Sequence, residues 1–112
     1  MIKCLVTGLF GTEVRSGSLL VIGLLGESHA SEIARILNRA VSRVQAALVS
    51  LEEAGVIVSS FQGNTRRVRL NPRLPVLDEL RALLNKLGMV DGPLQQKLAE
   101  ERRRPRRRGK PL

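Results

Sequence analysis

The chain has 112 residues, enough for one small domain and a tail, and its net charge of +9 favours a polyanionic partner, with nucleic acid ahead of a membrane surface. A single Cys and a single His exclude an internal disulfide framework and disfavour structural zinc sites and nucleophilic triads. With two Phe and no Tyr or Trp, the core has to be built from aliphatic side chains.

The positive charge is concentrated in two segments. Residues 102–112 carry seven basic residues and no acid, and residues 35–73 carry seven Arg against two Glu. We therefore expect one basic feature in the middle of the fold and a second one in a C-terminal tail. The tail, 102–112, lacks the apolar residues that a core requires and is predicted to be disordered.

No targeting segment is predicted. The first six residues lack the long apolar region and the small-residue cleavage site of a signal peptide. The apolar run over residues 18–26 is too short to span a bilayer. The sequence therefore predicts a cytoplasmic protein with no membrane partner, in keeping with a lone reduced Cys.

The first helix is predicted from the apolar pattern that follows an unassigned N-terminal segment, residues 1–12. Residues 13–25 suit a mostly buried helix that Gly26 ends. The Val and Ile in this run leave a strand as an alternative.

The next two predicted helices lie close together in the sequence. One begins near Ser28 or His29, each near capping-box spacing from Glu32, and ends at Asn38. The other, over residues 40–54, is the clearest helix of the chain because its apolar residues recur at three- and four-residue steps. Only a few residues join the two, as in a helix-turn-helix.

A hairpin and a fourth helix follow. Residues 56–60 and 66–70 predict two strands joined by a Gly-containing turn, and the second strand is basic. Residues 76–87 predict a Leu-rich helix that ends at Gly88, and the spacing over residues 89–101 allows a further short helix.

This order predicts an α+β fold, mainly α: a winged helix-turn-helix domain over residues 13–88, with three helices, a β-hairpin wing and a C-terminal helix. Residues 29–57, HASEIARILNRAVSRVQAALVSLEEAGVI, resemble the helix-turn-helix of the arsenical-repressor-like (ArsR-like) winged-helix regulators. The most specific part is LVSLEEAGVIVSSFQGNTRRVRLNP, residues 48–72. The resemblance covers about residues 9–88 and implies a DNA-binding fold, usually dimeric, that acts as a transcription regulator. Some members of the family are joined to nucleotidyltransferase domains.

Two positions depart from the pattern of this family. The third helix begins with Ala40 and Val41 where relatives often have Ser and Pro, which removes a capping hydroxyl worth about 1 kcal/mol and a phosphate donor. The return strand carries Val68 and Arg69 where relatives often have Tyr. Both departures bear on base readout and leave the fold unchanged.

The third helix and the wing supply the candidate DNA contacts. A major groove admits an α-helix whose Arg, Asn and Gln side chains read base edges. Four side chains near the start of the third helix are expected to do so: Arg39, Ser42, Arg43 and Gln45. Four at the wing tip are expected to reach phosphates or the minor groove: Gln62, Asn64, Arg66 and Arg67. The alternatives are an ordinary solvated helix face and an edge hairpin that its charge keeps soluble.

Two further features concern assembly and the tail. The fourth helix has more apolar residues than one small core needs, so part of its stripe is assigned to a homodimer interface: Leu80, Leu83, Leu84 and Leu87. The Arg-rich tail is expected to hold phosphates without reading sequence. Its alternatives are RNA, an acidic partner or solubility alone.

Metal and enzyme chemistry are both disfavoured. Cys4 and His29 supply too few ligands for a zinc-type site, so no metal and no cofactor are expected. Gly11-Thr12 distantly resembles the Gly-Ser of a nucleotidyltransferase, but the first Asp of the chain is Asp78. The pair of Asp residues that would hold magnesium therefore cannot be assembled beside it.

The sequence thus predicts a sequence-specific regulator of transcription that binds double-stranded DNA as a homodimer and is not an enzyme. The alternative is a protein–protein interaction module that docks a separately encoded partner, such as a nucleotidyltransferase-type enzyme. RNA binding is disfavoured because the chain lacks stacking aromatic residues.

Overall fold

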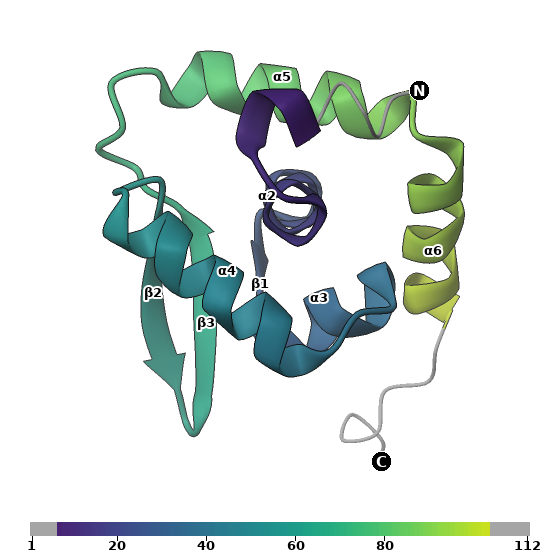
Figure 1. Ribbon diagram of the computed structural model, residues 1–112, viewed down its shortest axis with the longest axis horizontal. Coiled ribbons are helices and arrows are strands. Elements are labelled where there is room, and N and C mark those ends of the chain that lie inside the picture. Colours follow the sequence, from purple (N-terminus) through teal and green to yellow (C-terminus); the bar gives the residue numbers. More distant parts are fainter. Residues whose placement is uncertain (1–6, 104–112) are drawn as a thin grey trace.

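The described part of the chain, residues 7–103 of a computed structural model, is α+β and mainly helical (Figure 1). A short helical segment over residues 7–10 comes first. The elements that follow are α2 (Glu13–Leu25), β1 (Glu27–Ser28), α3 (Ala30–Leu37), α4 (Val41–Glu53), β2 (Ile57–Gln62), β3 (Thr65–Leu70), α5 (Leu77–Met89) and α6 (Gly92–Arg103).

Helix α2 lies at the centre, and Figure 1 looks along its axis with the other helices and the sheet around it. It begins after Thr12, whose Oγ1 accepts a hydrogen bond from the Arg15 backbone N–H at 3.1 Å. It ends at Gly26, whose φ of +85° is one that a residue with a Cβ rarely adopts. Val21 and Ile22 are fully buried between these ends. Residues 13–25 are therefore a helix, and the strand alternative is wrong.

Helix α5 packs against α2 at a separation that requires glycine. A Cβ on Gly23 would lie 2.8 Å from the Leu84 Cβ, and one on Gly88 would lie 2.6 Å from the Leu24 Cδ1. The prediction that Gly88 ends the fourth helix is wrong, because α5 continues to Met89 and Gly88 is buried within it. This glycine permits the close approach of two helices.

This packing corrects the assignment of the α5 leucines to a dimer interface. Leu84 and Leu87 are 0% and 6% exposed and belong to the chain's own core, so neither is free to contact a second copy. Leu80 is half-buried against the same core, and Leu83 is the exposed member of the four. The apolar surface that α5 leaves exposed is smaller than its sequence suggests, because α2 covers much of its row of leucines.

Helices α3 and α4 are joined by a short turn. Asn38 has the left-handed φ of +57° that fits its predicted place at the end of a helix. The predicted capping box is wrong: His29 is the N-cap of α3 and makes no side-chain capping bond. Ser28 Oγ donates instead to the Glu32 carboxylate at 2.6 Å, from a position within β1.

Strands β2 and β3 form the predicted hairpin, and both are longer than predicted. Phe61, Gln62 and Thr65 belong to the strands, which leaves Gly63, with a φ of +65°, and Asn64 as the turn. Strand β1 pairs antiparallel with β3, so the sheet has the order β1-β3-β2. A strand of two residues carries no alternation from which the sequence could have predicted it.

Helix α6 covers the region between α3 and α5. Asp91 caps its first turn by accepting a hydrogen bond from the Leu94 backbone N–H at 3.1 Å, and Leu94 and Leu98 pack into the core. Glu101 accepts hydrogen bonds from Arg35 of α3 at 3.1 and 3.2 Å. These contacts attach α6 to the helix-turn-helix segment.

Helix α6 reaches Arg103, so the first two residues of the segment predicted to be disordered, 102–112, are helical. The rest of the predicted tail, residues 104–112, and residues 1–6 with Cys4 lie outside the described residues. Within residues 7–103, no helix combines the length and the apolar character that a membrane crossing requires.

Candidate nucleic-acid interface

The outward face of α4 carries three of the contact residues predicted for the third helix. Ser42, Arg43 and Gln45 are all exposed. The opposite face of the helix packs into the core through Val44, Ala47, Leu48 and Leu51. The N-cap residue is Ala40, which has no side chain that could bond the first-turn amides. Exposed polar groups and the positive end of the helix dipole therefore lie together at the start of α4.

Apolar and acidic side chains share the rest of this face. Val41 and Val49 are 41% and 43% exposed, and Ala46 is exposed between them. Glu52 and Glu53 lie in the last turn of the helix. The basic and amide character of α4 is thus confined to its first half.

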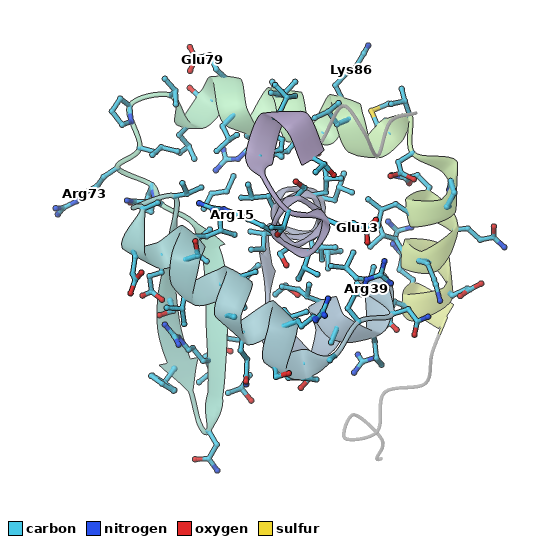
Figure 2. The ribbon with its side chains drawn as sticks, in the orientation of Figure 1. Glu13, Arg15, Arg39, Arg73, Glu79 and Lys86 are labelled. Carbon is cyan, nitrogen blue, oxygen red and sulfur yellow. The ribbon has the colours of Figure 1, made fainter. Side chains whose placement is uncertain are left out.

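Arg39 lies in the turn before α4 and is engaged within the chain. Its guanidinium pairs with Glu13 at the start of α2 and donates a hydrogen bond to the Asn38 carbonyl at 3.1 Å (Figure 2). This side chain connects α2 to the turn that leads into α4. The structure therefore does not bring Arg39 onto the α4 face with Arg43 and Gln45.

Glu52 joins α4 to both strands of the hairpin. Its carboxylate accepts a hydrogen bond from Ser59 Oγ of β2 at 2.9 Å and pairs with the Arg66 guanidinium of β3. Side chains alternate along a strand, so Phe61 lies on the same side of the hairpin as Ser59, the side that faces α4. Arg66 pairs with Phe61 across the hairpin and lies on that side too. The hairpin and α4 thus form one surface, which includes Arg66.

Arg67 lies on the other side of the hairpin. Its Nη1 is 3.2 Å from His29 Nδ1, and its Nε is 3.7 Å from the Glu27 carboxylate. Burial lowers the pKa of His29, the Glu32 carboxylate opposes this shift, and the guanidinium groups of Arg67 and Arg35 reinforce it. A neutral His29 can accept a hydrogen bond from Arg67, which anchors that arginine beside β1 and α3 and away from the α4 surface.

The hairpin tip is open to solvent. Gln62 and Asn64 are exposed there, where the sequence predicted contacts to phosphates or the minor groove. Two further exposed side chains were not predicted as contacts: Phe61, at 71% exposure on the α4 side, and Arg69, on the far side with Arg67. Strand alternation counted from the buried end of the hairpin would have identified Arg69, whereas it places Phe61 on the inner side, where only the reach of the hairpin beyond the core exposes it.

The described residues hold no obvious metal centre. Within residues 7–103, no three His, Cys, Asp or Glu side chains are grouped so that they could hold a metal ion. Of the two residues considered as ligands, His29 contacts Arg67, and Cys4 lies outside the described range.

Comparison with known proteins identified no similar family, protein or structure. A scan against protein-family models, a search of curated proteins and a search of solved structures each found no match.

Proposed function

We propose that this chain is a winged helix-turn-helix protein that binds double-stranded DNA and regulates transcription, with α4 in the major groove and the β2–β3 hairpin as the wing. The proposal is carried by one observation: the polar first half of α4 is exposed, and Glu52 holds a basic hairpin beside that helix. A short turn joins α4 to α3, as it does in DNA-binding motifs of this kind.

Each contact residue has a distinct role in this proposal. Arg43 and Gln45 read base edges, and within residues 7–103 the Arg43 side chain has no hydrogen bond or ion pair that would compete. Arg66 contacts a phosphate. Its ion pair with Glu52 is partly solvent-exposed and contributes only about 0–1 kcal/mol, so the guanidinium can exchange Glu52 for a phosphate at little cost. Arg39 acts indirectly, by holding the turn before α4 against Glu13.

We also propose that the DNA-binding form is a homodimer. Since Leu84 and Leu87 are buried, the interface has to use the apolar side chains that remain exposed along α5 and beyond its end: Leu83, Met89 and Val90, at 40%, 70% and 59% exposure. Leu83 lies at the middle of α5, and Met89 and Val90 lie at its C-terminal end, so a second copy could cover them along one half of the helix.

The test is a binding titration of the full chain against a fluorescently labelled pool of random duplexes and against the sequences selected from that pool. We expect Arg43→Ala to weaken binding to the selected site about five- to 150-fold, which corresponds to about 1–3 kcal/mol for a base contact. Arg81→Ala, which removes one exposed charge from α5 outside the proposed dimer surface, is the matched control and should change binding less than about twofold. Equal effects of the two substitutions would refute the placement of α4 in the groove.

A protein–protein interaction module is the second candidate, and one observation favours it. Val41, Val49 and Phe61 expose apolar surface on α4 and on the side of the hairpin that faces it, and a protein partner could cover that surface. Salt distinguishes the two functions, because affinity for random duplex DNA falls steeply with salt concentration. A chain that shows no salt-dependent binding to any duplex would favour the interaction module.

A further inference from the structure

A cavity of about 640 Å³ lies between the first turns of α2, the turn joining α3 to α4, and the start of α6. Its volume falls within the range of sites that hold small organic molecules. Apolar side chains from these three regions contribute to its walls: Val14, Leu20, Leu37 and Leu94. An occupant therefore needs an apolar body.

The charged groups at the cavity indicate the sign of the occupant's charge. Glu13 is paired with Arg39, and the Asp91 carboxylate is bonded to the first turn of α6. Lys97, also at the cavity, has no ion pair within residues 7–103. Because both carboxylates are engaged and a lysine remains, the site favours an anion.

We propose that this cavity binds a small organic acid, with an apolar ring-sized body between α2 and α6 and a carboxylate beside Lys97. A bound carboxylate can also compete with Glu13 for the Arg39 guanidinium. Arg39 stands next to Ala40, the N-cap of α4, so the competition acts on the turn that orients α4. The consequence for DNA binding rests on the proposed function, whereas the binding of the acid does not.

The site is tested with three probes that share a naphthalene body and differ in charge: 2-naphthoate, neutral 2-naphthamide and cationic 2-naphthylmethylamine. Each is titrated into the full-length ¹⁵N-labelled chain, and backbone amide shifts are followed by NMR. We expect 2-naphthoate to bind most tightly of the three and to shift the amides of Gly17, Asn38 and Lys97. Equal affinity for all three probes, no binding of 2-naphthoate, or shifts confined to other surfaces would overturn the proposal.

Two variants locate the anion and the apolar body. Lys97→Glu should weaken 2-naphthoate binding about fivefold or more, because it replaces the attracting charge by a repelling one. Binding of neutral 2-naphthamide should stay unchanged, because residue 97 is exposed and its replacement leaves the core intact. Lys86→Glu is the matched control, since this exposed lysine lies on α5 away from the cavity. Val14→Phe, checked for folding by circular dichroism, should weaken binding of every probe. An unchanged affinity for 2-naphthoate in Lys97→Glu overturns the assignment even if Val14→Phe fails to fold.

The regulatory consequence is measured separately, as the affinity for labelled duplex DNA with and without saturating 2-naphthoate. We expect a several-fold change that Lys97→Glu reduces and that Arg81→Glu, at an exposed α5 residue away from the cavity and the proposed dimer surface, does not. If the acid binds in the cavity but the chain binds no duplex, the proposed function fails and the site stands. If the chain binds duplex DNA with an affinity that the bound acid does not alter, the link through Arg39 is wrong.

Discussion

Replacing Leu84 by Ala separates a core role from an interface role for the α5 leucines. The Leu84 side chain is fully buried against Gly23, which has no side chain that could move into the space left behind. Large-to-small substitutions at such sites cost about 3–5 kcal/mol when the surroundings cannot collapse. That cost is a large part of the roughly 5–15 kcal/mol that stabilises a domain of this size.

The matched comparison is Leu83→Ala, one residue away in the same helix and 40% exposed. We expect this change to lower the free energy of unfolding by less than about 1 kcal/mol. Urea denaturation of both variants at two protein concentrations tenfold apart measures the difference. The assignment of Leu84 to the core of one chain is refuted if Leu83→Ala is the more damaging, or if the loss caused by Leu84→Ala appears only at the concentration where the parent is dimeric.

Three further outcomes are expected. Phe61→Trp gives the chain a single Trp, whose emission should be quenched on duplex DNA if the ring contacts bases; unchanged emission on a bound duplex would place it off the DNA. Deletion of residues 104–112, which removes five basic residues, should lower the slope of log affinity against log salt by up to about 4 without changing the preferred sequence, and a changed preference would contradict a purely electrostatic tail. The free energy of unfolding should fall as the pH drops from 7 towards the lowered pKa of His29, because His29 binds a proton at higher pH in the unfolded chain than in the folded one. Urea titrations should show a smaller fall in His29→Asn, and an equal fall would exclude His29 as the cause.

Local signals made the main helices and the hairpin predictable. Gly26 and Asn38 both have the positive φ that ends a helix, and both ends were predicted from residue type alone. The hairpin was predicted from a β-branched run, a Gly-containing turn and alternation in the return strand. These features depend on neighbours only a few residues away, so the sequence expresses them directly.

The errors at Gly88 and at the candidate arginines arose where distant segments meet. Gly88 was predicted as a helix end because glycine has that role more often than the role of admitting Leu24 from another helix. The candidate arginines depend in the same way on distant acids: Arg39 pairs with Glu13, and Arg66 pairs with Glu52. A charge pattern shows how many cations a segment has, but the fold decides which of them are already paired.

The central position of α2 has a consequence for how the molecule opens. Its backbone amides are enclosed by other elements, and Gly23 brings α5 so close that the two helices must separate before either can loosen. Amide hydrogens of Val21 and Ile22 should therefore exchange with solvent only through global unfolding. The hairpin tip around Gly63, which is exposed on all sides, should exchange through small local openings many orders of magnitude faster. The surface proposed to meet DNA can thus fluctuate while the helix behind it stays fixed.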